Sequence, residues 1–298
     1  MKILYATDGF EPAVDAGTLL EKIGHRDRID VTVMSVTHAG IPAPEHMPIM
    51  LDPVPSRRED TLEIVDAAVS KLLAAGFKAA GRTAEGHPGQ EIVRVVEKDW
   101  YDLVVMGSGN RTWLGARLLG SVSTYVLHSS PWSVLIAHEA LPGDTKGRVL
   151  VGTDGSRGAE FTVETLARFA DPARTEITVA SVVPINSPLL MSVPGPTHFS
   201  DDDLEHTKEL EQRMRERGRR HADRAATLLR DAGFEAEERI DAGNPTEQLL
   251  KEADSGQFDL VAVGSRGLGP FRRALLGSVS DHVARHSRAA LVGRRLAT

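Results

Sequence analysis

The sequence predicts an α/β protein made of two tandem doubly wound domains, each with a mainly parallel five-stranded sheet flanked by helices. The first observation is an internal repeat: ILYATDG at 3–9 matches VLVGTDG at 149–155, and LLGSVS occurs at 118–123 and again at 275–280. The second is that short runs of Val, Ile and Leu alternate with amphipathic stretches in each copy. Such continuous apolar runs are typical of parallel strands buried on both faces. Copies of this length indicate a domain duplication rather than a solenoid.

The spacing of the repeat locates the two domains. The copies are 146 residues apart at the first strand (149 minus 3) and 157 residues apart at LLGSVS (275 minus 118). The second copy therefore carries 11 extra residues (157 minus 146) after its second strand. The segment LPGDTKG at 141–147 is polar and rich in turn residues, as expected of a domain join. We expect domain 1 to span residues 1–143 and domain 2 to span residues 144–298.

Strands and helices alternate along each copy. The second helix of domain 1 starts with a capping box, because Ser56 is followed three residues later by Glu59. In domain 2 the corresponding long helix is expected to begin at Ser200. The elements expected in domain 1 are strands at 2–7, 31–38, 78–83, 102–107 and 133–138, and helices at 12–23, 57–75, 89–98 and 116–128.

Composition excludes several classes of protein. The chain has 298 residues, of which 41% are hydrophobic and 26% charged, as is usual for a soluble globular protein. No run of 18 apolar residues is present, so we expect no membrane partner. The absence of cysteine excludes disulfides, thiolate catalysis and Cys-type zinc sites. A formal charge of −7 argues against nucleic-acid binding. With no signal-peptide pattern at the N-terminus, we expect a cytoplasmic protein.

The residues that follow the strands favour a nucleotide. In open α/β sheets a ligand usually binds beyond the carboxyl ends of the strands, and Asp8 and Asp154 each follow a first strand. Glycines after the fourth strand let the backbone approach a ligand, and a helix N-terminus favours an anion. The hydroxyls of Ser278 and Ser280 would add donors. A carboxylate suits a ribose hydroxyl or a base amino group, so the pattern favours an anionic sugar nucleotide.

The motif G-x2-G-x9-G-S after an apolar strand, together with a DG turn after the first strand, resembles the universal stress protein family. The resemblance covers nearly all of the chain, as a tandem two-domain member. It implies an ATP-binding (adenine nucleotide-binding) stress-response regulatory protein, with Mg²⁺ shared among the phosphates. It also implies that the final strands pair the two domains about a pseudo-twofold axis. An unknown protein partner and a homodimer are further expectations.

The resemblance also implies which residues bind the nucleotide. Asp154 and Val182 would meet the adenosine, and the glycine segments would surround ribose and phosphates. Domain 1 departs from the motif, because Asn110 stands where the second glycine should be. Asn visits the left-handed region more readily than other non-glycine residues, so the turn can survive. The implied residues are Asp8, Val36, Met106, Gly107, Asn110, Gly120, Ser121, Val122 and Ser123 in domain 1, and Asp154, Val182, Val263, Gly264, Ser265, Gly267, Gly277, Ser278, Val279 and Ser280 in domain 2.

Other interpretations remain open. The glycines could serve only tight strand–helix packing, with Ser121 and Ser278 as N-caps, and Asp8 and Asp154 could only cap the helices that follow. The chain could be a nucleotide-free interaction or stress-protection module, or a slow ATPase. Efficient catalysis is not expected, because the sequence has no P-loop, no G-x-G-x-x-G after the first strand and no recognisable Ser/His/Asp order.

Three further stretches receive simpler interpretations. His282 and His286 have the i, i+4 spacing of metal ligands but lack a third ligand, so a surface helix is expected. The basic run at 213–224 includes glutamate and is expected to be a solvated helix face. The Pro- and Met-rich segments 44–56 and 184–200 are predicted to be flaps over the nucleotide or a partner surface.

Overall fold

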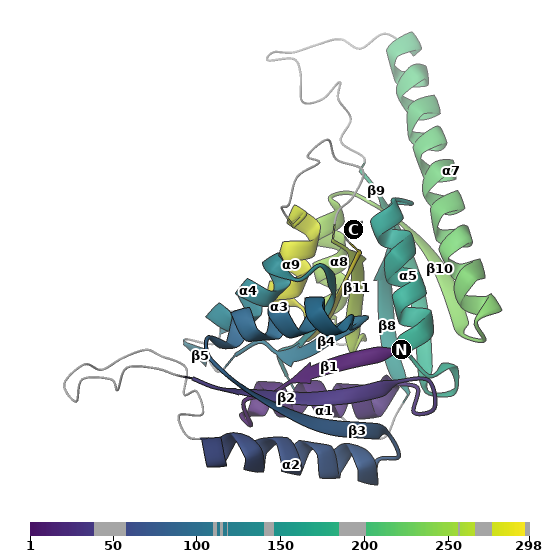
Figure 1. Ribbon diagram of the computed structural model, residues 1–298. Coiled ribbons are helices and arrows are strands. Elements are labelled where there is room, and N and C mark those ends of the chain that lie inside the picture. Colours follow the sequence, from purple (N-terminus) through teal and green to yellow (C-terminus); the bar gives the residue numbers. More distant parts are fainter. Residues whose placement is uncertain are drawn as a thin grey trace.

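The strands of both copies form one continuous sheet. The computed structural model describes residues 1–38, 58–109, 112–113, 116–117, 119–139, 146–184, 201–255, 257–265 and 276–295. The strands of domain 1 are β1 (Lys2–Ala6), β2 (Asp30–Thr37), β3 (Lys78–Glu85), β4 (Leu103–Gly107) and β7 (Trp132–Ala137). Those of domain 2 are β8 (Gly147–Gly152), β9 (Thr175–Val183), β10 (Glu235–Ala242), β11 (Leu260–Gly264) and β12 (Ala289–Arg295). Within these residues the sheet has ten strands in the order β10-β9-β8-β11-β12-β7-β4-β1-β2-β3 (Figure 1).

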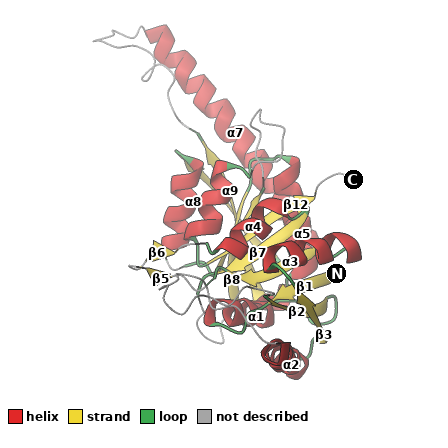
Figure 2. Cartoon of the chain, turned by 60° about the vertical axis from the view of Figure 1, so that its left-hand side comes forward, coloured by secondary structure: helices red, strands yellow, loops and turns green. Residues whose placement is uncertain are grey.

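Helices cover both faces of this sheet. One face carries the apolar cluster to which α1 (Glu11–Ile23), α2 (Arg58–Ala74), α5 (Arg157–Phe169) and α7 (Asp201–Asp231) contribute. The other carries the cluster formed with α3 (Pro88–Asp99), α4 (Ser121–Ser129), α8 (Pro245–Asp254) and α9 (Ser278–His286). A short 3-10 helix, Pro172–Arg174, precedes β9. The N-terminal half of α7 projects beyond the body of the molecule (Figures 1 and 2).

The two halves of the sheet meet where β7 runs antiparallel to β12. The register places Leu135 opposite Leu291, both fully buried. Every other pairing in the ten-stranded sheet is parallel. The expectation of two five-stranded parallel sheets is therefore confirmed, as is the pairing of the two final strands. These strands lie at the centre of the sheet, and its edges are β3 and β10.

Two backbone hydrogen bonds at the ends of α1 and α5 connect the halves symmetrically. His25 N–H donates to Phe169 O at 2.9 Å, and Asp171 N–H donates to Ile23 O at 2.7 Å. Residues 25 and 171 are 146 positions apart, as are 23 and 169, so each half makes the same hydrogen bond to the other. This reciprocity is the mark of a twofold relation between the domains.

Two ion pairs also connect the halves at aligned positions. Lys22 Nζ lies 3.2 Å from Asp259 Oδ2, with side chains only 8% and 3% exposed. The aligned pair, Arg168 and Asp102, lies 3.1 Å apart with side chains 54% and 31% exposed. Asp259 Oδ2 also accepts a hydrogen bond from Arg148 N–H at 2.9 Å. The first pair is buried and the second is largely solvated.

The predicted elements are close to the observed ones, with one error at the start of a helix. The helix expected at 116–128 begins only at Ser121, because Gly120 has an extended backbone (φ −65°, ψ 168°) and forms the N-cap. Residues Ala116–Arg117 are instead a short strand, β6, paired with β5 (Thr112–Trp113).

Several expectations lie outside the described residues. These are the proposed domain boundary at residue 143, the cap at Ser56, the start at Ser200, the segment 44–56 and nearly all of the segment 184–200. Within the described part of the chain, no helix combines the length and the apolar character needed to span a bilayer.

The buried ion pair between the halves yields a prediction. Replacing Lys22 by Ala should lower the free energy of unfolding by about 3 kcal/mol, because the buried Asp259 carboxylate loses a cationic partner. The aligned variant Arg168→Ala is the control and should cost less than about 1 kcal/mol, because that pair is solvated. Urea denaturation of the two variants measures the difference, and equal costs would contradict the assignment of Lys22 as the buried link.

Candidate functional site

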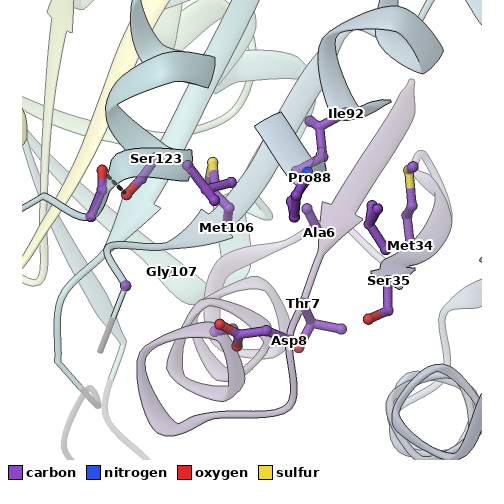
Figure 3. Close-up of a pocket in the computed structure, with 15 residues that line it drawn as sticks. Ala6, Thr7, Asp8, Met34, Ser35, Pro88, Ile92, Met106, Gly107 and Ser123 are labelled. Atoms are coloured by element: carbon purple, nitrogen blue, oxygen red, sulfur yellow. Dashed lines mark hydrogen bonds between the residues drawn. The ribbon is translucent and has the colours of Figure 1, made fainter. Parts of the chain in front are cut away.

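A pocket opens in domain 1 at the carboxyl ends of β1, β2 and β4, on the face that α3 and α4 cover. Its empty space is about 690 Å³ when open solvent at the mouth is included. Figure 3 shows Ala6, Met106, Ile92 and Met34 around a common space, with Thr7 and Asp8 at its lower side. The lining residues are Ala6, Thr7, Asp8, Ala13, Met34, Ser35, Val36, Pro88, Ile92, Met106, Gly107, Gly109, Gly120, Val122 and Ser123.

The pocket brings together most of the residues expected for domain 1. Ser121 adjoins the pocket but is exposed and does not line it, and Asn110 lies outside the described residues. The expected residues that line the pocket are Asp8, Val36, Met106, Gly107, Gly120, Val122 and Ser123.

Other lining residues were not expected from the sequence. Met34 could have been found, because alternate residues of a strand share a face and Met34 is two positions from Val36. Pro88 and Ile92 come from the start of α3, whose position over β2 is a tertiary contact that carries no local sequence signal.

The turn after β1 holds Asp8 in place. Thr7 Oγ1 accepts a hydrogen bond from Gly9 N–H at 3.1 Å, and Asp8 Oδ1 accepts from Phe10 N–H at 3.1 Å. Gly9 has φ +82°, a left-handed conformation that glycine adopts without strain. The N-cap of α1 is Phe10, without a side-chain cap. The Asp8 carboxylate therefore forms an Asx turn before α1 and is not its N-cap.

Domain 2 repeats this turn. Asp154 Oδ1 accepts from Ser156 N–H at 2.9 Å, and Gly155 has φ +72°. Ser156 caps α5 with its own hydroxyl, which accepts from Ala159 N–H at 3.3 Å. Because the cap comes from Ser156, the alternative that Asp154 serves as the cap of α5 is also wrong.

The helix that follows each glycine segment begins without a side-chain cap. Gly120 and Gly277 are the N-caps of α4 and α9, so the alternative that Ser121 and Ser278 are N-caps is wrong. The first hydrogen bond of the α4 turn runs from Thr124 N–H to Gly120 O at 2.9 Å. The amides of residues 121–123 come before it and point along the dipole of the helix, an arrangement suited to an anion.

Serine hydroxyls tie these helix starts to the preceding strands. Ser123 Oγ donates to Ser108 O at 2.7 Å, and Ser280 Oγ donates to Gly264 O at 2.6 Å. In this structure the Ser280 hydroxyl donates within the protein, and its expected role as a donor to a phosphate stays a prediction. In domain 1 Gly120 N–H also donates to Ser108 O, at 2.6 Å.

The aligned residues of domain 2 occupy the same elements. Asp154, Val182, Val263, Ser265 and Val279 stand at the positions of Asp8, Val36, Met106, Ser108 and Val122, while Gly267 lies outside the described residues. Close packing alone explains why residue 264 is a glycine, because a Cβ there would lie 2.6 Å from the Gly158 carbonyl carbon. For Gly264 the packing interpretation therefore holds whatever binds.

The side chains around the two sites differ in volume. At the positions of Ala6, Met34 and Met106, domain 2 has Gly152, Ala180 and Val263. Each replacement is smaller, so the apolar wall of domain 2 carries less side-chain volume than that of domain 1.

Charge also differs at the two helix starts. The first turn of α9 carries Asp281, where α4 has Thr124. Arg285 donates to both Asp281 oxygens, at 2.8 and 3.0 Å, and this hydrogen bonding lowers the pKa of the carboxyl. His128 of α4 approaches the same carboxylate to 3.7 Å. The negative charge at the start of α9 is thus balanced by the Arg285 guanidinium.

Three rings, those of His38, His87 and Tyr125, lie close together near the start of α3. The His38 and His87 rings have centroids 6.3 Å apart, and the His87 and Tyr125 centroids are 6.1 Å apart. His87 immediately precedes the lining residue Pro88. Because these residues come from three separate segments, the sequence alone does not bring them together.

The histidines of α9 behave as surface residues. His282 Nδ1 lies 2.9 Å from Ser278 O, within its own helix, and the His282 and His286 ring centroids are 6.1 Å apart. Among the described residues, no group of three or more histidine or acidic side chains is arranged to hold a metal ion.

Comparison with known proteins gives consistent matches along both halves. The model of the universal stress protein family matches residues 1–138 and 146–292. A universal stress protein of Mycolicibacterium smegmatis is 32% identical over 61% of this chain, a match that spans 58% of its own length. Universal stress protein Rv2623 of Mycobacterium tuberculosis is 27% identical, over 78% of this chain and 75% of that one.

Solved structures show the same fold. A universal stress protein from Archaeoglobus fulgidus superposes with a TM-score of 0.57 at 24% identity, covering 99% of this chain and 96% of that one. The family model matches both halves almost completely, in the order expected of a duplication. The chain therefore belongs to the universal stress protein family, as a member with two tandem domains.

Proposed function

We propose that each domain binds an adenine nucleotide, ATP in the first place, and that the bound nucleotide regulates the association of this protein with a partner during a stress response. The observation that carries the proposal is the domain 1 pocket, in which a carboxylate, an apolar wall and an uncapped helix start meet. These three features match the three parts of a nucleotide: sugar, base and phosphates.

Each part of the nucleotide has a matching surface. Met34, Val36 and Ile92 form an apolar wall suited to the flat face of a base. Asp8 lines the pocket, and its carboxylate is an acceptor suited to the ribose hydroxyls. The amides of residues 121–123 suit the phosphates. Mg²⁺ would then be bound mainly through phosphate oxygens and water, as is usual for that ion.

A regulatory role fits this site better than catalysis. Its described lining includes one acidic side chain, Asp8, and neither lysine nor arginine. A ligand that binds only the folded protein stabilises it by mass action, and it can favour one conformation over another. ATP binding would in this way bias which surface the protein offers to a partner.

The Asp8 turn yields a test of both sites. Asp8→Asn retains an oxygen to accept from Phe10 N–H but removes the carboxylate suited to the ribose hydroxyls. We expect ATP affinity at domain 1 to fall about tenfold, the effect of losing a hydrogen bond to a charged group. Asp154→Asn should do the same at domain 2. Isothermal titration calorimetry with ATP measures both, with the exposed Asp223→Asn of α7 as control. Unchanged affinity and stoichiometry in both variants would overturn the site assignment.

The start of α4 yields a test of phosphate binding. Ser121→Pro removes one amide hydrogen at the first helical position, where proline is tolerated, and the extended Gly120 is compatible with a following proline. We expect ATP binding at domain 1 to weaken severalfold while adenosine binding stays the same. Ser121→Ala is the control, because it removes the hydroxyl and keeps the amide. Equal loss for ATP and adenosine would show that the amide does not bind phosphate.

A further inference from the structure

A second hollow lies in domain 1 on the opposite face of the sheet, between α1 and α2. Its empty space is about 890 Å³, open solvent included. The helices that form it contribute to the cluster on the α1/α2 face, whereas the pocket described above lies on the α3/α4 face. Figure 1 shows α2 set beneath β2 and β3, apart from α3 and α4. We call this hollow the back pocket.

The back pocket has an apolar floor and apolar walls. Tyr5 and Leu72 are buried at its floor, 3% and 1% exposed, and Ile64 and Ala68 of α2 form one wall. Val14 of α1, on the other wall, is 41% exposed, which is unusual for a valine that faces a neighbouring helix. Apolar surface left open in this way is typical of a binding site rather than of a closed core.

The rim of the back pocket is charged, with an excess of carboxylate. Glu21 of α1 pairs with Lys71 of α2, whereas Glu63 lies eight residues before Lys71, about 12 Å along α2, so the net negative charge of the rim lies at the Glu63 end. Glu21 Oε1 is buried and lies 3.2 Å from Lys71 Nζ, but without the angle of a hydrogen bond. The Glu21 charge is therefore balanced by Lys71, and Glu63 supplies the open carboxylate of the rim.

Tyr5 keeps its proton and does not supply charge to the pocket. Burial, together with the Glu21 and Asp8 carboxylates, raises the pKa of Tyr5 to about 12. Its hydroxyl donates to Ala13 O at 2.7 Å. Gly17 makes room for that hydroxyl, since a Cβ there would lie 2.7 Å from it. The floor is therefore neutral, and the charge of the back pocket comes from its rim.

The back pocket shares a wall with the proposed nucleotide site. Thr7 lines both hollows, one on each face of the sheet. The Ile64 side chain rests on the same turn, because a Cβ on Gly9 would lie 2.9 Å from Ile64 Cγ1. A molecule that displaces Ile64 would therefore press on the turn that holds Asp8.

The hollow of domain 2 that aligns with the back pocket differs from it in size and in side chains. Its hollow between α5 and α7 has about 370 Å³ of empty space, open solvent included. His221 and Arg224 replace Ile64 and Ala67 there, each 157 positions later. The His221 ring lies against the turn, since a Cβ on Gly155 would lie 1.7 Å from His221 Nδ1. The aligned hollow is smaller, and its charged side chains, Glu160 and Arg224, form an ion pair 3.0 Å apart.

We propose that the back pocket of domain 1 is a second binding site, which takes a small amphipathic ammonium compound. Its apolar body lies against Tyr5, Ile64 and Ala68, and its ammonium group lies beside the exposed Glu63. Occupancy shifts the turn that carries Asp8. The hollow is present without a bound nucleotide, and the aligned hollow of domain 2 differs from it in size and side chains.

Phenethylamine is a suitable probe, with 2-phenylethanol as its uncharged analogue. Methyl NMR of the full chain during a millimolar titration should show shifts at Val14, Ile64 and Leu72, and amide shifts at Asp8 and Gly9 should follow. Val163 and Leu228 of the domain 2 hollow should not respond. The uncharged analogue should bind about fivefold more weakly, because it lacks the ion pair with the rim.

Matched variants separate the pocket from unspecific binding. Ala68→Phe should fill the pocket and reduce phenethylamine binding at least about tenfold, whereas Ala74→Phe, on the exposed end of the same helix, should not. Glu63→Gln should weaken the amine about fivefold without affecting the alcohol, and Glu59→Gln is its control. Because Glu63 is exposed, its variant tests the proposal even if Ala68→Phe does not fold. The proposal is overturned if Ile64 does not shift, if amine and alcohol bind equally, or if Glu63→Gln has no effect.

Discussion

The antiparallel pairing of β7 with β12 is the constraint on which the remaining architecture depends. It converts two parallel five-stranded sheets into one sheet and buries the strands that would otherwise be open edges. Strands in the two halves run in opposite directions, so their carboxyl ends lie at opposite ends of the sheet. Both candidate sites nevertheless lie on the same face, the one that α3, α4, α8 and α9 cover. The two candidate sites therefore follow strand ends that point in opposite directions.

The β7–β12 pairing, which we call the seam, also supports α4 and α9, the helices whose first turns border the candidate sites. His138 Nε2–H, just after β7, donates to Ala284 O of α9 at 2.7 Å. Arg294 of β12 donates from Nη1 to His128 O at 3.1 Å and Ser130 O at 3.0 Å, at the end of α4. Each half therefore satisfies carbonyls at the C-terminal end of the helix from the other half. These contacts hold the C-terminal ends of α4 and α9, whose N-terminal ends begin without a side-chain cap.

Sequence patterns predicted the fold well and the candidate site in part. The repeat and the apolar strands predicted both domains, because buried parallel strands appear in a sequence as continuous runs of Val, Ile and Leu. The spacing of the glycines placed Gly107, Gly120 and Ser123 around one pocket, since these lie at strand and helix ends. Local patterns did not reveal that the hydroxyls of Ser123 and Ser280 are used on main-chain carbonyls, because that depends on rotamers. They also missed Pro88, Ile92 and the back pocket, which arise from packing between distant segments. The helix predicted from residue 116 failed because apolar periodicity continues past the glycine that caps it.

Carrying both halves of the seam on one polypeptide has a consequence for how the two sites can diverge. A seam between separate chains weakens on dilution, whereas a tethered seam has a fixed effective concentration. Identical subunits must also satisfy both sides of their interface with a single sequence, and every substitution then appears twice. This chain does not have that requirement, because its two halves differ in sequence. Substitutions such as His221 for Ile64, or Val263 for Met106, need to be compatible with only one half. The duplication thus permits the two halves to specialise while they remain joined in one chain and do not dissociate.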